Sequence, residues 1–396
     1  MSVAAHRIPS VRFAPGNTEV LTELGPLANL VGTWEGRGFN LIARPDFHDR
    51  ANLYLQLSQT HENFRVSPVG SAIPNRGFGQ DDINMYGVDY LDKIHDEHTG
   101  GALHLEPGLW VYQPDPATTF PPENVDPAQL VHRMASIPHG NAVLASGTAT
   151  SFTGPPTLDT ENAPYNGSIF PSFNSTPFGA GGPLNAAGSS DAGTAAANPN
   201  VVIKFDQYDL TVPSGAGNPR TPYGTDPSEQ VDDPIDGLKL QDVVNDPILL
   251  LQAQIQQQAA RGDQFEGIAL NIASQATVTF NTQPNSVVGP TAPTVKVPVP
   301  GAGGGTENIL FLEGVPDGAH KPVNNAHTAL VYATFWITTV HPKDRAPYQQ
   351  LQYAQMVELD FPIFSKLNPT DGSAPVNVDL GWPHISVATL RKSFNA

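Results

Sequence analysis

The segment GTWEGRG, residues 32–38, opens a series of strand-like runs and decides how the fold is interpreted. A tryptophan here can close one end of a small barrel, and glycines in a strand allow it to bend. Further runs come after it, separated by Pro, Gly, Asn and Asp: 39–43 (FNLIA), 53–59 (LYLQLSQ), 83–93, 102–113 and 129–147. This rhythm indicates an antiparallel meander rather than βαβ units.

Two other kinds of segment flank this meander. Residues 1–31 form a lead-in whose end, LTELGPLANLV (21–31), reads as a short helical stretch that plugs or caps the strands after it. Residues 151–200 consist largely of Gly, Pro, Ala, Ser, Thr and Asn and indicate a long surface excursion. Residues 233–261, which include LLLQAQIQQQAA, predict one helix that stops at Gly262.

Strand signals then resume, at 265–282, 308–313, 328–340, 351–361 and 384–392. Counting both ends gives about ten strands, with no repeat at a fixed period. We therefore expect an all-β fold, an antiparallel up-and-down β-barrel of the lipocalin-like kind. Its single domain spans 32–396 and is interrupted at about 150–325 by a loop-rich insertion that contains the helix.

Composition excludes several classes of protein. The 396 residues include 39 prolines, 36 glycines and no cysteine, so disulfides, thiolate nucleophiles, zinc fingers and iron–sulfur clusters are excluded. The formal charge of −18, without a basic cluster, disfavours nucleic acid as a partner. No signal peptide and no apolar membrane span is recognisable, so we expect a soluble, cytoplasmic protein.

Four motifs in order carry a family resemblance: GTWEGRG (32–38), LHLEPGLW (103–110), MAS (134–136) and HISVATLRK (384–392). Together they resemble the nitrobindin family of haem-binding β-barrels, which are related in shape to fatty-acid-binding proteins. The resemblance covers roughly residues 24–147 and 327–394. Family barrels are less than half as long as this chain, which leaves the insertion without a counterpart.

The resemblance implies that His384 is the proximal ligand of iron in haem b. Alternation along a strand agrees with this, because it places His384, Ser386 and Ala388 on one face, where two small side chains leave room for a flat macrocycle. The alternative is that His384 packs as a rim residue against Trp382 and Pro383.

The resemblance also implies a distal side of the pocket, lined by Leu103 and His104. A distal histidine can donate a hydrogen bond to a bound oxidant or act as an acid or base on it, so His104 is a candidate catalytic residue. The alternative is that His104 points outward and only pairs with Glu106. Ser136 matches a distal polar position, and His139 is a second catalytic candidate.

The resemblance implies a haem protein that acts on NO, peroxynitrite or peroxide, with peroxidase-like or peroxynitrite isomerase-like activity. The insertion could add a channel for an apolar organic substrate over the haem edge. One alternative is a carrier of a fatty acid or other apolar ligand, with Arg37, Arg133 and Arg345 as candidate basic groups. Another is an interaction protein or homo-oligomer whose loops form an interface.

A last motif, His95-Asp96-Glu97-His98, contains side chains that ligate metals. With His104 it could build a mononuclear site. A polar turn between two strands explains the motif more simply, and we favour this interpretation.

Overall fold

Strands dominate the computed structural model of the chain. The structure describes residues 17–46, 51–75, 83–114, 129–137, 142–156, 158, 210–211, 213–215, 219–222, 238–245, 247–273, 277–281, 294–298, 327–364 and 377–393. The helical elements are α1 (Asn17–Glu23), η1 (Gly25–Leu30), α3 (Leu240–Asn245) and α4 (Leu249–Ala260). The strands are β1 (Gly32–Asp46), β2 (Ala51–Pro68), β3 (Ile73–Asn75), β4 (Ile83–Asp96), β5 (Ala102–Gln113), β6 (Gln129–Ser136), β7 (Ala142–Thr153), β8 (Gln264–Ala273), β9 (Thr277–Asn281), β10 (Thr294–Pro298), β11 (His327–His341), β12 (Tyr348–Phe364) and β13 (Asn377–Ser393).

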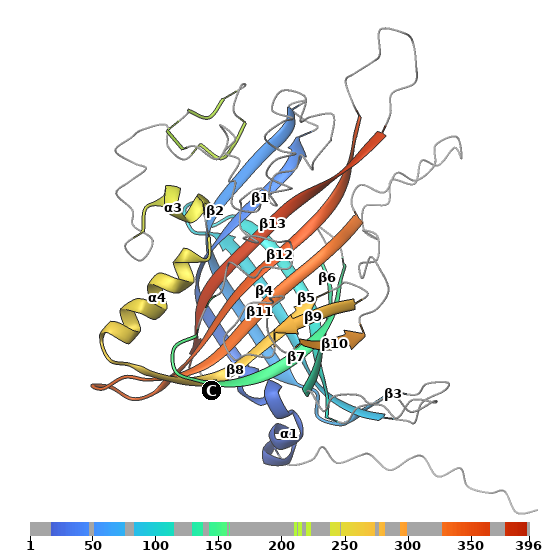
Figure 1. Cartoon of the computed structure of the whole chain (residues 1–396), viewed down its shortest axis with the longest axis vertical. Coiled ribbons are helices and arrows are strands. Elements are labelled where there is room, and N and C mark those ends of the chain that lie inside the picture. Colours follow the sequence, from blue (N-terminus) through green and yellow to red (C-terminus); the bar gives the residue numbers. More distant parts are fainter. Residues whose placement is uncertain are drawn as a thin grey trace, which may run out of the picture.

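Ten of these strands close into one antiparallel barrel (Figure 1). The sheet order is β2-β1-β13-β12-β11-β8-β7-β6-β5-β4-β3, and an additional pairing of β2 with β4 closes the ring and leaves β3 appended to β4. Each barrel strand pairs with the barrel strands before and after it in the chain, so the barrel is an up-and-down meander. The expected fold class is confirmed.

The first and last barrel strands approach each other closely. Gly36 and Gly38 of β1 pair with Leu390 and Ala388 of β13. A Cβ atom at either glycine would collide with a carbonyl oxygen of β13. Glycine at these two positions therefore allows the backbones at the closing seam to approach, a role distinct from the bending expected from the sequence.

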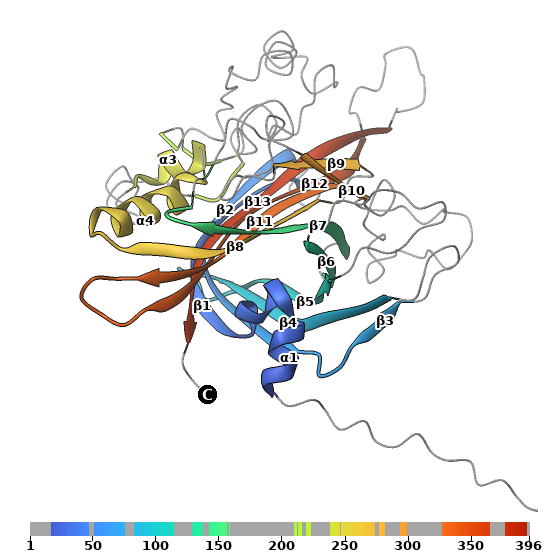
Figure 2. The ribbon, with the colours of Figure 1, turned by 60° about the horizontal axis from the view of Figure 1, so that its bottom comes forward.

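The described part of the lead-in, α1 and η1, plugs one end of the barrel, the end that is turned toward the viewer in Figure 2. Leu24, Leu27 and Leu30 are at most 1% exposed and belong to the main apolar cluster. The indole Nε1 of Trp34 donates to the backbone oxygen of Leu30 at 2.7 Å. The described part of the lead-in is thus helical and caps the barrel, and Trp34 anchors it.

The segment expected as one insertion is divided by a barrel strand. β8 pairs with β7 on one side and β11 on the other, so it completes the barrel wall. The expected interruption at 150–325 therefore consists of two segments, one before β8 and one after it. The expected helix at 233–261 is likewise two helices, α3 and α4, because Pro247 between them lacks an amide hydrogen for a continuous helix.

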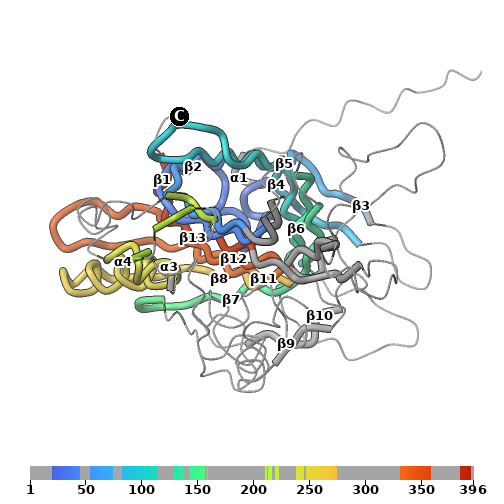
Figure 3. The backbone as a smooth tube through the Cα atoms, turned by 90° about the horizontal axis from the view of Figure 1, so that it is seen from above, coloured from blue at the N-terminus to red at the C-terminus, as the bar shows by residue number. Residues whose placement is uncertain are grey.

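The helices of the insertion, α3 and α4, lie on the outer wall of the barrel (Figure 3). Gln258 of α4 is fully buried, and its Nε2 donates to Gln350 Oε1 at 2.7 Å and to the hydroxyl of Tyr348 at 2.8 Å. Arg220 forms a bridge with Leu55 of β2. For these residues, the expected position over the pocket opening is wrong, because they cover the face of the sheet that points away from the lumen.

Other expected segments can be placed briefly. The run expected at 129–147 is two strands, β6 and β7, and the run expected at 308–313 lies outside the described residues. β9 and β10 form a separate two-stranded sheet. Among the described residues, no helix combines the length and apolar character needed to cross a bilayer.

Candidate functional site

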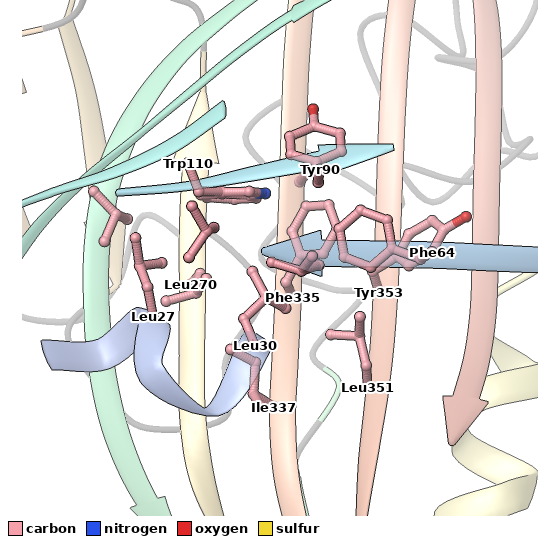
Figure 4. Close-up of a cluster of buried hydrophobic side chains, with 14 of the residues drawn as sticks. Leu27, Leu30, Phe64, Tyr90, Trp110, Leu270, Phe335, Ile337, Leu351 and Tyr353 are labelled. Carbon is pink, nitrogen blue, oxygen red and sulfur yellow. The ribbon is translucent and has the colours of Figure 1, made fainter. Parts of the chain in front are cut away.

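An apolar cluster fills the end of the barrel lumen nearest η1. Side chains alternate along each strand, and the inward-facing members from several strands meet the leucines of η1 (Figure 4). The cluster includes Leu27, Leu30, Trp34, Trp110, Leu270, Phe335, Ile337 and Leu351. The rings of Trp110 and Phe335 meet edge to face, with centroids 5.1 Å apart. This end of the lumen is therefore a packed core.

Above this cluster, Arg133 of β6 crosses the lumen. Its Nε donates to the Tyr90 hydroxyl at 2.9 Å, its Nη2 to Glu106 at 2.5 Å and its Nη1 to Gln355 at 2.5 Å. The guanidinium also lies over the ring of Phe335, 5.1 Å from the centroid. Arg133 thus connects β4 and β5 with β12 on the opposite wall, and each of its three nitrogens has a partner.

A second group of acids lies at the same level. The Tyr353 hydroxyl of β12 donates to Glu62 Oε2 of β2 at 2.7 Å, and the carboxyl groups of Glu62 and Asp92 hydrogen bond to each other. Two carboxyl groups can do this only when one carries a proton. Together with Tyr90, Glu106, Arg133 and Gln355, these three residues form what we call the polar layer.

Burial and mutual repulsion set the protonation of this layer. Burial is the main cause that raises the pKa of Glu62 to about 7, and it raises the pKa of Asp92 well above its usual range, assisted by the charges of Glu62 and Glu106. Burial also acts to raise the pKa of Glu106, but the Arg133 guanidinium outweighs it and holds this pKa well below its usual range. The layer therefore contains one ionised carboxylate, paired with Arg133, and one acid pair that holds a proton near neutral pH.

His104 borders the polar layer from β5. Its Nε2 lies 3.1 Å from Glu106 Oε2, and its side chain is 22% exposed. Because an ionised carboxylate only accepts hydrogen bonds, Nε2 carries the hydrogen, and Nδ1 is the acceptor in the neutral ring. His104 faces the lumen, on the side of the strand that also carries Glu106 and Trp110. It does pair with Glu106, but from an inward-facing position.

The inner face of β13 carries three of the expected site residues. Ala388 belongs to the apolar cluster, so Ser386 and the half-buried His384 follow it on the same face by alternation. Ala388 pairs with Tyr353, whereas His384 pairs with Val357. Gln355 of the polar layer pairs with Ser386, so His384 lies two residues, or about 7 Å along the strand, beyond the layer and away from η1.

The remaining expected residues are not gathered at this wall. Leu103 is the extra residue of a β-bulge, since Ala102 pairs with His95 while His104 pairs with Ile94. Ser136 is exposed. Its neighbour Ala135 packs against the core, so Ser136 points to the opposite face of the strand. His139 lies outside the described residues.

The acidic and histidine cluster at 95–98 forms a turn. Asp96 Oδ1 accepts hydrogen bonds from the backbone nitrogens of His98 and Thr99, at 3.1 Å and 2.8 Å. Glu97 pairs with Arg37 at 2.6 Å. In the part of the chain that the structure describes, no group of three His, Cys, Asp or Glu side chains is arranged to hold a metal ion. The polar-turn interpretation of this motif agrees with the contacts.

The three candidate basic groups are also separated. Arg37 is 76% exposed, and Arg345 is exposed beside the ring of Tyr348. Of the three, Arg133 is the residue that the structure places inside the barrel, where Glu106 neutralises it.

Sequence reasoning missed Glu62 and Asp92. Two signals could have found them. Asp92 lies two residues from both Tyr90 and Ile94 on the same strand, so the three side chains share a face. An acid on the face that carries these apolar residues is expected to face the lumen. Glu62 lies beyond the expected run at 53–59 in the same register as Phe64 and Val66, but its charge made this part of the strand look like a loop.

A separate depression of about 570 Å³ lies at the ends of β7, β8 and β11. Its lining includes Asp263, Glu266 and His341, and the last two pair at 3.0 Å. Asp263 pairs with Arg261 at 3.4 Å. These three side chains of the depression are thus paired with each other or with a neighbour.

Comparisons with known proteins add little. No family model matches the chain, and no curated protein matches it. Among solved structures, the crystal structure of Rv2717c from M. tuberculosis matches with a TM-score of 0.29 and 9% sequence identity, over 94% of this chain and 97% of that one. A similarity this low supports no conclusion about function.

Proposed function

We propose that the barrel binds haem b in the part of the lumen beyond the polar layer, with His384 as the protein ligand of the iron. The observation that carries this proposal is the inward-facing position of His384 on β13, in line with Ser386 and Ala388. A porphyrin supplies four nitrogen ligands itself, so a single imidazole on a barrel wall is sufficient. His384 as a single protein ligand therefore fits haem b, although the described residues contain no group of three metal-binding side chains.

The resemblance of the opening and closing motifs to nitrobindins supports the same proposal. Haem b held by His384 would supply an iron able to react with NO, peroxynitrite or peroxide. His104 is held by Glu106 and can accept or return a proton at Nδ1. Small-oxidant chemistry, of a peroxidase-like or isomerase-like kind, is the activity that we propose for this arrangement.

The alternative of a fatty-acid carrier has weaker support from the described lumen. A buried carboxylate ligand needs a cation, and Arg133 already has partners at all three nitrogens. Arg37 and Arg345 lie on the exterior. We therefore do not propose a carboxylate ligand for this barrel.

A hemin titration tests the proposal. We expect a sharp Soret band that saturates at about one haem per chain in the wild type, and a lost or shifted band in His384→Ala. His341→Ala is the matched control, because His341 pairs with Glu266 on the exterior and should bind hemin as the wild type does. Equal, weak binding by all three proteins would contradict the proposal.

A further inference from the structure

The polar layer contains more acid than its bases neutralise. Arg133 ion pairs with Glu106, and within the described residues no second lysine or arginine belongs to the layer. Glu62 and Asp92 are left with each other. The titratable and charged groups that face this pair are Tyr353 on β12, Tyr90 on β4, Glu106 and His104 on β5, and Arg133 on β6.

Asp92 also carries an unused acceptor. Asp92 is only 7% exposed, and its Oδ1 atom has no hydrogen-bond partner among the described residues. A buried polar atom without a partner costs free energy, and such atoms are rare in folded proteins. The shared proton satisfies one oxygen of each carboxyl group but leaves Asp92 Oδ1 without a donor.

We propose that Glu62 and Asp92 bind the head group of an organic ammonium ion. An ammonium group offers several donors, which match Asp92 Oδ1 and the Glu62 carboxylate, and its positive charge replaces the proton that the pair gives up. The apolar body of the ligand would extend away from the packed cluster, along the inner face of β13 toward the half-buried Ser386 and His384.

Other ligand classes fit this pair less well. A metal ion needs a set of ligands that the described residues do not provide. A carboxylate would face three acids and an arginine that is already paired. The ammonium head group lies at the level of Ala388, apart from His384, so the inference does not require haem to bind. Because the apolar body shares the lumen with the proposed haem, the tests below use the protein without hemin.

The proton balance of binding predicts its pH dependence. An alkylammonium ion keeps its charge throughout the neutral range, whereas the acid pair loses a proton as the pH rises through the pKa of Glu62, about 7. Binding to the anionic pair is favoured, so affinity should rise about tenfold between about pH 6 and about pH 8.5. At the lower pH, binding should release a proton to the buffer.

Isothermal titration calorimetry of the full chain tests these expectations with octylammonium, octanoate and octanol as probes. We expect octylammonium to bind at least about tenfold more tightly than the other two at about pH 8.5. Buffers with different ionisation enthalpies report the proton that is released at about pH 6. Octanoate or octanol binding as tightly as octylammonium, or no detectable binding of octylammonium at either pH, would overturn the proposal.

Variants separate the acid pair from the rest of the barrel. Asp92→Asn keeps the shape of the side chain but removes its charge, so it should weaken octylammonium binding at least about tenfold. Glu266→Gln is the control, because Glu266 is an exposed acid on the exterior, and it should bind as the wild type does. Equal affinity in the two variants would also overturn the proposal. If Asp92→Asn does not fold, Glu62→Gln takes its place and should weaken octylammonium binding in the same way. The comparison of octylammonium, octanoate and octanol on the wild type tests the proposal without any variant.

Discussion

Arg133 and Glu106 are charged residues in the middle of a barrel, 5% and 1% exposed. Burying two charges is costly unless hydrogen bonds complete both groups. Here the guanidinium also bonds to Tyr90 and Gln355, so the charge pair is accommodated by side chains from four strands. Because hydrogen bonds are directional, these contacts specify which strands face each other across the lumen. Apolar side chains in the same place would specify this arrangement less strictly.

The acid pair makes stability depend on pH. Because the pKa of Glu62 is raised from 4.5 to about 7, its contribution to stability is fully present below about pH 4.5 and is lost as the pH rises through 7, a change of about 3 kcal/mol. Asp92 acts in the same direction. We therefore expect Glu62→Gln to lose less stability than the wild type between about pH 5 and about pH 8, measured by urea unfolding.

The control for this prediction is Glu266→Gln, which removes an exposed acid from the exterior. Its stability should track that of the wild type across the same pH range. A pH profile of Glu62→Gln that parallels the wild type would contradict the assignment of this pH dependence to the buried pair.

Among the elements, β2 shows most clearly what the sequence could and could not predict. Its first half, with Leu55 and Leu57, reads as a strand, whereas its second half contains Glu62 and reads as a polar loop. Alternation predicts which side chains share a face, but not that an acid on one strand meets Asp92 and Tyr353 across the lumen. The apolar strands and the plug were therefore predictable, and the polar layer was not.

β8 was hidden for a related reason. Its sequence, QFEGIALNIA, was recognised as strand-like, but it lies between two segments rich in loops. Only its pairing with β7 and β11 shows that it belongs to the barrel wall. The sequence of a single strand does not determine which strands pair with it, because pairing depends on how the whole sheet closes.

The plug formed by η1 offers a test at the level of an element. Leu27 is fully buried in the apolar cluster, so Leu27→Ala should lower the free energy of unfolding by about 2–5 kcal/mol. Leu21 on α1 is 39% exposed, and Leu21→Ala should change it by less than about 0.5 kcal/mol. Urea unfolding measures both, and equal effects of the two variants would contradict the plug.

The whole molecule is a ten-stranded barrel with a packed end, a polar layer and additional chain on its outer wall. α4 packs against β12 from outside through Gln258 and Gln350. The expected substrate channel over the lumen therefore receives no support from the described part of the insertion. The ligand chemistry that we propose depends on the barrel strands alone.

The most direct test of the haem proposal is the absorption spectrum of hemin-loaded His384→Gly, recorded with and without added imidazole. We predict that the variant lacks the wild-type Soret band and that free imidazole restores it, because the small ligand can occupy the space of the missing ring. A variant whose spectrum equals that of the wild type without imidazole would contradict the assignment of His384 as the iron ligand.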